Sequence, residues 1–162
     1  MASLPDSCFQ DAPLIAQDVA RGVGRLFFRQ DQFAICEVPL PNGRRADLMA
    51  IDGAGLITIV EIKVSRADLM GDGKWPDYLD YCDYFFWAVP TGFALEPFAC
   101  AEKGEDCSGL IVADRYDAEI IRPAPLRKLA AARRKAETLR FARRAARRLA
   151  GDMDPGLPAI DY

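Results

Sequence analysis

Three charged residues have the types and spacing of a site that cleaves phosphodiesters with a divalent metal ion. Asp47 lies in one apolar run, and Glu61 and Lys63 lie two residues apart in the next. If the runs pair as a hairpin with Ile51 opposite Ile57, Asp47 falls opposite Glu61. Two carboxylates at that spacing repel each other unless a cation lies between them.

Magnesium suits such a pair, because proteins bind it through one or two carboxylates together with waters and a substrate phosphate. We therefore expect Mg²⁺ at Asp47, Glu61 and the backbone carbonyl of Ile62. Lys63 would orient or deprotonate the attacking water and offset charge on the phosphate. A simpler interpretation stays open, in which Glu61 and Lys63 are solvated at a strand end and Asp47 belongs to a turn.

Two strands and a turn are expected to position this group. Residues 45–51 alternate in character as a strand does, Asp52-Gly53-Ala54-Gly55 has turn composition, and residues 57–63 are rich in β-branched side chains. The alternation places Asp47, Glu61 and Lys63 on the face assigned to the core. Buried charge in an otherwise apolar strand favours the catalytic interpretation.

The flanking sequence predicts a single layered α/β domain. A helix is expected over 14–28, with Asp11 or Pro13 near its start, and Ser65 is expected to cap a short helix. Asn42-Gly43 predicts a hairpin turn. The remaining expectations are a helix over 74–82, a loop over 91–108, and strands over 33–40, 84–89, 110–113 and 119–121.

Composition excludes several classes of catalyst. The chain has no histidine, so it cannot supply Ser/His/Asp triads, Cys/His dyads or histidine-based metal centres. Its five cysteines form no C-x-x-C pair, which argues against a zinc site and against a disulfide framework. With no signal peptide and no membrane-spanning apolar run in the sequence, we expect a cytoplasmic protein that contacts no membrane.

A basic helix is expected over 126–150. Between Leu126 and Leu149 there are ten Lys and Arg against one Glu, a net charge of +9, whereas the whole chain carries −3. We expect a leucine and alanine stripe to dock this helix on the domain and leave the arginines exposed for phosphates. The stripe comprises Leu126, Leu129, Ala136, Leu139, Ala146 and Leu149. The alternative is a solvated helix that balances the acidic body.

The expected domain organisation has four parts. Residues 1–12 form a flexible tail, 13–125 the α/β domain, 126–150 the basic helix packed on it, and 151–162 a C-terminal tail.

Together these motifs resemble the PD-(D/E)XK nuclease superfamily over roughly residues 14–90, and within it the MmcB-like DNA repair proteins. The resemblance rests on Asp47, on Glu61-Ile62-Lys63, and on Lys74 with Tyr78 four residues later, and it extends to the segments 109–114 and 118–122. It implies a restriction-endonuclease-like central mixed sheet flanked by helices. It also implies Mg²⁺ or Mn²⁺ at Asp47 and Glu61, with Lys63 beside the nucleophilic water.

Substrate contacts are expected from Lys74, Tyr78, Arg44 and Arg45, although Tyr78 could equally be a core residue. On an α-helix Lys74 and Tyr78 would lie one above the other.

Two departures from the superfamily pattern are visible. Ala46 precedes Asp47 where proline is usual, and the first helix lacks the glutamate that many members use as an extra ligand. Asp18 or Glu37 could supply that acid.

The expected function is therefore metal-dependent nuclease activity in DNA repair. Alternatives are an inactive DNA-binding or scaffolding module with the same fold, and a protein-interaction domain whose basic helix docks on an acidic partner. No base-reading helix is recognisable, so DNA recognition is expected to follow structure rather than sequence. A homodimer would suit double-strand cleavage.

Overall fold

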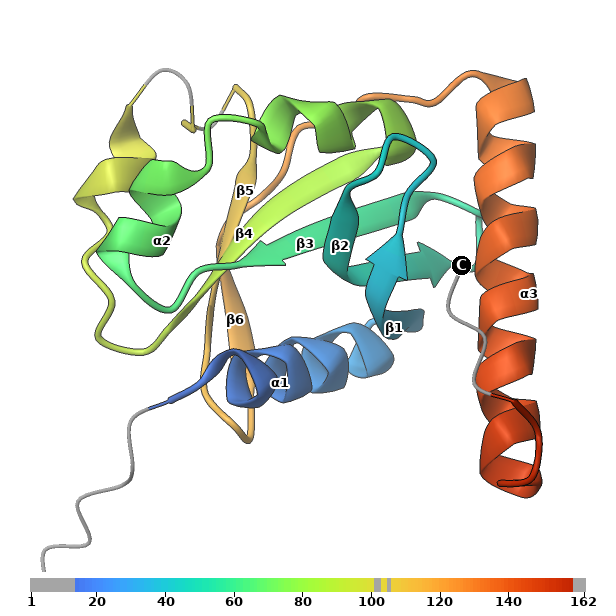
Figure 1. The fold of residues 1–162 in the computed structure, drawn as a ribbon. Helices are drawn as coiled ribbons and strands as arrows, with labels where there is room; N and C mark the ends of the chain where they lie inside the picture. Colours follow the sequence, from blue (N-terminus) through green and yellow to red (C-terminus); the bar gives the residue numbers. More distant parts are fainter. Residues whose placement is uncertain (1–13, 101–102, 105, 159–162) are drawn as a thin grey trace, which may run out of the picture.

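The structure, a computed structural model, describes residues 14–100, 103–104 and 106–158. The predicted tail over 1–12 lies outside these residues, as do Asp11 and Pro13. Six strands form one mixed sheet in the order β1-β2-β3-β4-β5-β6, with helices against both faces (Figure 1). The predicted mixed α/β sheet flanked by helices is confirmed. None of the helices in the described part of the chain is long and apolar enough to cross a membrane.

The strands keep their chain order across the sheet. The pairs β1·β2, β2·β3 and β5·β6 are antiparallel, and β3·β4 and β4·β5 are parallel. Parallel neighbours need a crossover, which explains why the helical segments fall between β3 and β5. The bounds are β1 Gln32–Pro39, β2 Arg45–Asp52, β3 Ile57–Ile62, β4 Tyr84–Pro90, β5 Gly109–Ala113 and β6 Ala118–Arg122.

Helix α1, Ala16–Arg29, covers one face of the sheet, close to the predicted bounds (Figure 1). Its buried residues recur every three or four positions, so one stripe of the helix faces the sheet: Val19, Gly22, Val23, Leu26 and Phe27. Gly22 is required here, because a Cβ atom at this position would lie 2.2 Å from the carbonyl oxygen of Asp114. This close approach fixes α1 against the turn between β5 and β6.

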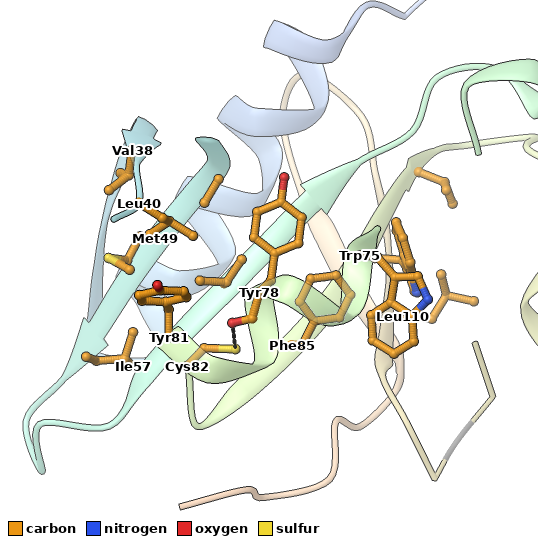
Figure 2. Close-up of a cluster of buried hydrophobic side chains, with 14 of the residues drawn as sticks. Val38, Leu40, Met49, Ile57, Trp75, Tyr78, Tyr81, Cys82, Phe85 and Leu110 are labelled. Carbon is orange, nitrogen blue, oxygen red and sulfur yellow. Dashed lines mark hydrogen bonds between the residues drawn. The ribbon is translucent and has the colours of Figure 1, made fainter. Parts of the chain in front are cut away.

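The opposite face holds an aromatic core (Figure 2). Helix α2, Arg66–Gly71, begins at Ser65, whose hydroxyl accepts a hydrogen bond from the Asp68 amide as predicted. Two 3₁₀ helices follow, η1 over Trp75–Tyr81 and η2 over Glu96–Ala99, the second inside the predicted loop.

The segment around Lys74 corrects one prediction. An α-helix would place Lys74 above Tyr78, but η1 has three residues per turn and Lys74 is its exposed N-cap. The side chains that share one face are therefore Trp75, Tyr78 and Tyr81, three positions apart and all buried. Aromatic packing against β4 selects this tighter helix, with Tyr78 stacked on Phe85 at 5.9 Å between ring centroids.

The C-terminal helix α3 runs over Ala131–Met153, so the prediction of a helix over 126–150 was wrong at both ends. Long-range hydrogen bonds hold the preceding segment extended. The Arg127 amide donates to the Asp83 carbonyl at 2.8 Å, and the Leu129 amide donates to Asp83 Oδ1 at 2.9 Å. These bonds tie residues 127 and 129 to Asp83, and the helix begins only at Ala131. The predicted tail over 151–162 begins inside α3, and its last residues, 159–162, lie outside the described part.

The predicted docking stripe of α3 is largely exposed. Leu139 is 59% exposed and Leu149 is 62% exposed, whereas Phe141 packs against the core and Glu137 is buried. The prediction that the whole stripe docks on the domain was therefore wrong, although Leu129, which precedes the helix, does pack against the core. The helix instead turns Glu137, Phe141 and Arg148 toward the domain, where Arg148 donates to the Glu37 carbonyl at 3.1 Å.

Candidate functional site

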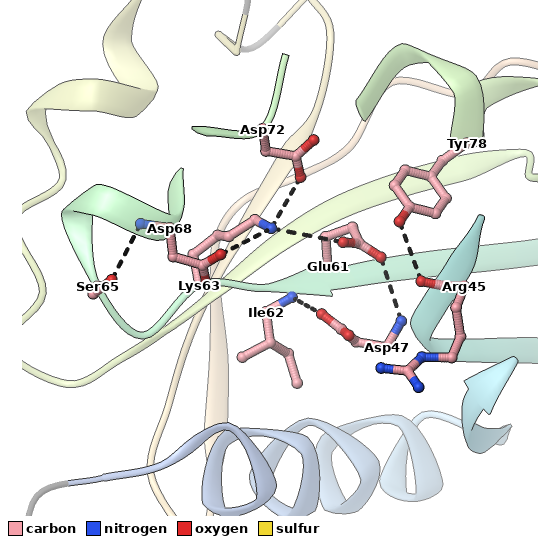
Figure 3. A network of polar contacts seen from close by, with 9 residues as sticks. All are labelled: Arg45, Asp47, Glu61, Ile62, Lys63, Ser65, Asp68, Asp72 and Tyr78. Atoms are coloured by element: carbon pink, nitrogen blue, oxygen red, sulfur yellow. Dashed lines mark hydrogen bonds and ion pairs between the residues drawn. The ribbon is translucent and has the colours of Figure 1, made fainter. Parts of the chain in front are cut away.

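The site lies where strands β2 and β3 separate. Their pairing is confirmed in the predicted register, with Ile51 opposite Ile57, and its final pair is Leu48 with Val60. Beyond that pair, side chains replace the backbone carbonyls as hydrogen-bond acceptors. Asp47 Oδ2 accepts from the Ile62 amide at 2.7 Å, and Glu61 Oε1 accepts from the Asp47 amide at 3.3 Å (Figure 3). The two carboxylates therefore lie together in the opening between the strands.

Burial and mutual repulsion make it unfavourable for both carboxylates of this pair to be ionised at once. Glu61 is only 4% exposed, and desolvation together with the charge of Asp47 raises its pKa to about 8. Desolvation also raises the pKa of Asp47, against the lowering effects of the Ile62 amide and the Lys63 ammonium. Without a bound metal ion, the pair of carboxylates retains one proton near neutral pH.

Lys63 provides the buried positive charge nearest to this pair. Its Nζ lies 2.9 Å from Asp72 Oδ2 and 3.8 Å from Glu61 Oε2 (Figure 3). Burial alone would lower its pKa, but the hydrogen bond to Asp72 and the surrounding carboxylates outweigh burial and raise the pKa. Lys63 is therefore a protonated ammonium. Of its two expected roles, orienting a water fits this state and deprotonating one does not.

Two residues that hold Lys63 were not predicted. Asp72 is the C-cap of α2, and Asp68 Oδ1 in its first turn lies 3.8 Å from Lys63 Nζ. The sequence carried a usable signal, because the helix opened by Ser65 directly follows Lys63 and is too short to carry its acids far away.

Tyr78 approaches the carboxylates from the aromatic side of the sheet. Its hydroxyl donates to the Arg45 carbonyl at 3.1 Å and lies beside the Glu61 carboxylate. Burial and the charge of Glu61 raise the pKa of Tyr78, so its hydroxyl keeps its proton. Tyr78 thus joins η1 to β2 at the opening, so its expected role as a core residue is confirmed, whereas the expected substrate contact stays a prediction.

Three other residues expected at the site are held by partners outside the carboxylate pair. Arg44 pairs with Asp77 at 3.0 Å, and Arg45 pairs with Glu37 at 2.6 Å, both near the surface. Asp18 accepts from the Ile15 amide at the start of α1 and lies 3.7 Å from Arg115. It therefore caps its own helix rather than joining Asp47.

A groove of about 500 Å³ leads from the surface to Asp47, between α1 and strands β1 and β2. Its walls include Gln17 and Arg21 of α1 and Glu37 of β1, and Leu48 and Ile62 flank Asp47 inside it. Gln17 and Arg21 were not predicted as site residues. They are exposed polar side chains of α1 that line the same groove as Asp47, and no local pattern indicated them.

The oxygen donors present fit a hard divalent cation. Asp47 and Glu61 provide two carboxylates, the number with which Mg²⁺ is commonly bound when waters and a phosphate complete the shell. Among the residues that the structure describes, no cluster of three or more His, Cys, Asp and Glu side chains could hold a metal. The side chains would thus supply a minimal, two-carboxylate site and leave the remaining coordination positions to waters and a substrate phosphate.

The fold and site define a mixed α/β domain with a polar centre at the separated end of a β-hairpin. The sequence pattern of the family described as DNA repair protein MmcB-like matches residues 6–156, so the chain belongs to this family. It is also similar to a solved structure, the SPO1766 protein of unknown function from Silicibacter pomeroyi. Identity is 43%, the match covers 94% of this chain and 100% of the other, and the TM-score is 0.80. Curated proteins gave no match.

Proposed function

We propose that this protein is a metal-dependent nuclease of the PD-(D/E)XK superfamily that hydrolyses phosphodiester bonds of DNA during repair. The observation that carries the proposal is the convergence of Asp47, Glu61 and Lys63 where β2 and β3 separate (Figure 3). Burying two acids against each other raises their pKa and costs stability, and such a cost is typical of functional sites. Membership of a DNA repair family supports DNA as the partner.

The proposed roles follow from the chemistry of each group. A Mg²⁺ or Mn²⁺ ion held by Asp47, Glu61 and the Ile62 carbonyl would activate a water and polarise the scissile phosphate. Lys63 donates hydrogen bonds to the attacking water or to a phosphate oxygen, and Asp72 fixes its position. Tyr78 holds the β2 backbone at Arg45 so that Asp47 stays opposite Glu61.

A second candidate is a DNA-binding module without nuclease activity. The observation that favours it is that both carboxylates already accept backbone hydrogen bonds across the opening. In that case the pair would serve to bridge the separated strands, and the protonated form of Glu61 would suffice.

Calorimetric titration with Mn²⁺ and Mg²⁺, followed by cleavage assays on the same samples, separates the two candidates. The proteins would be wild type, Asp47→Asn and the control Asp80→Asn, which changes an exposed acid of η1. The substrates would be labelled duplex, nicked and branched DNA. We expect wild type and the control to bind metal and cleave, and Asp47→Asn to do neither while keeping its DNA affinity. DNA binding without metal uptake or cleavage by wild type would contradict the nuclease proposal.

A further inference from the structure

A second groove, of about 460 Å³, separates α3 from β1 and the turn that follows it. Its floor is apolar and includes Val38, Leu40, Met49 and Phe141. One wall is the C-terminal half of α3. Beyond Phe141 this half contributes only basic side chains to the groove, and Arg140 lies just before Phe141. The arginines are Arg140, Arg143, Arg144, Arg147 and Arg148. In Figure 1, α3 stands alongside the β1 and β2 end of the sheet.

The charge of this groove is strongly unbalanced. Five guanidinium groups line it, and the only acid among its lining residues is Glu137. Glu137 is buried and pairs with Arg140. Several positive charges on one wall attract a ligand with several negative charges. Arginine also forms paired hydrogen bonds with phosphates, so a chain of phosphates fits this wall.

The groove meets the candidate active site across the edge strand. Val38 and Pro39 line the arginine groove, and the preceding residues, Cys36 and Glu37, line the groove that contains Asp47. Arg148 donates to the Glu37 carbonyl at 3.1 Å, and the Glu37 carboxylate contacts Arg45, two residues before Asp47. A ligand that follows the arginines and crosses β1 therefore enters the groove that Asp47 lines.

Size and chemistry identify the kind of polyanion. A volume of about 460 Å³ holds a small organic group, which excludes a duplex from the groove itself. Phe141, the one aromatic side chain among its lining residues, offers an unpaired base a ring to stack on, and its arginines suit the adjoining phosphates, the combination used by proteins that bind single strands. A duplex would present only phosphates here and leave the floor uncovered.

We propose that the arginine groove binds an unpaired DNA strand and leads it over β1 to Asp47 and Glu61. This inference rests on the proposed nuclease function and specifies its substrate as DNA with a single-stranded arm.

Fluorescence anisotropy in EDTA tests binding separately from cleavage. Full-length protein would be titrated with a labelled single strand, the same strand with abasic sites, and the corresponding duplex, at several salt concentrations. The variant is Arg143→Ala with Arg147→Ala, both exposed. The matched control is Lys128→Ala with Lys135→Ala, which removes equal charge from exposed positions outside the groove.

We expect the single strand to bind best and the groove variant to lose at least about tenfold in affinity. The salt slope should fall by about 0.7 for each phosphate contact removed. The control should change much less, and abasic DNA should bind more weakly than the intact strand. Equal loss in both double variants, equal affinity for the duplex, or equally strong competition by polyglutamate would overturn the proposal.

These outcomes stay distinct from failure of the nuclease proposal. If strand binding behaves as expected but wild type neither binds metal nor cleaves forked DNA, the groove assignment stands and the catalytic assignment falls. If forked DNA is cleaved equally by wild type and the groove variant, the strand-guiding proposal falls instead.

Discussion

Two buried acidic centres of this protein have opposite surroundings. Asp83, 1% exposed, accepts hydrogen bonds from the Ile57 and Leu129 amides and pairs with Arg134 at 2.5 Å. Asp47 and Glu61 face each other, and each accepts one backbone hydrogen bond across the opening of their hairpin. Buried acids cost stability unless donors compensate them. Asp83 is therefore part of the scaffold. The Asp47 and Glu61 carboxylates have fewer donors around them, so a bound cation would stabilise their ionised forms.

Burial alone does not separate a structural acid from a functional one. Both centres interrupt apolar sequence, and both are shielded from solvent. The number and direction of donors separate them, because three donors hold Asp83 between β3, α3 and the segment before α3. At the other centre, the donors are few and a second acid raises the pKa of Glu61.

Removing Asp83 should produce the largest effect on stability. Asp83→Ala leaves Arg134 and two amides without their acceptor, so we expect a loss of about 3–5 kcal/mol in the free energy of unfolding. Urea denaturation measures it, with Asp80→Ala as the exposed control. A loss below about 1 kcal/mol would show that Asp83 is not the scaffold acid described here.

Removing Lys63 should reduce cleavage while largely preserving the fold. A buried ammonium aimed at developing charge is worth about 10²–10³ in rate, so we expect a loss of that size in Lys63→Met. Lys74→Met is the matched control, because Lys74 is exposed at the N-cap of η1. Single-turnover cleavage measures both, and a larger loss in the Lys74 variant would reverse their assigned roles.

The pKa of Glu61 predicts how stability depends on pH. In the unfolded chain Glu61 ionises near its ordinary pKa of 4.5, whereas in the fold it holds its proton to about pH 8. Between these values the folded state binds more protons, so the free energy of unfolding falls as pH rises. One proton contributes at most about 1.4 kcal/mol per pH unit.

Glu61→Gln should remove this contribution and make the protein more stable than wild type near pH 8. Urea denaturation from pH 4.5 to 8, without metal, tests the expectation. Parallel curves for the two proteins would contradict the raised pKa.

The exposed ion pair at the rim of the site should matter least. The Arg45 and Glu37 side chains are 65% and 53% exposed, so water screens their attraction. We expect Arg45→Ala to change the free energy of unfolding by less than about 1 kcal/mol, and less still at high salt. Thermal denaturation at two salt concentrations measures it, and a loss comparable to that of Asp83→Ala would overturn the distinction between rim and scaffold.

Sequence reasoning succeeded where local patterns determine structure. Alternation in two runs, with a turn between them, was enough to place Ile51 opposite Ile57 and hence Asp47 near Glu61. The Ser65 cap was equally local. The restriction-endonuclease-like identity of the sheet and the metal ligands stay predictions.

The predictions that were wrong or incomplete concern segments held by residues far away in the sequence. Asp83, more than forty residues before Leu129, holds the segment that precedes α3, and the local pattern of 126–130 carries no sign of this contact. The form of η1 depends on packing against β4, which removes Lys74 from the face of Tyr78. Asp72 was missed because its partner, Lys63, lies beyond a turn and a short helix.

The backbone of Glu37 has a further consequence, for assembly. Its φ of 53° is unusual for a residue other than glycine, it interrupts the pairing of β1 with β2, and its carbonyl is occupied by Arg148. An open edge strand is a template for pairing with another chain, and kinks and covering side chains prevent this. Both features disfavour the joining of two copies along β1 into one continuous sheet, so we expect a homodimer to use a different surface.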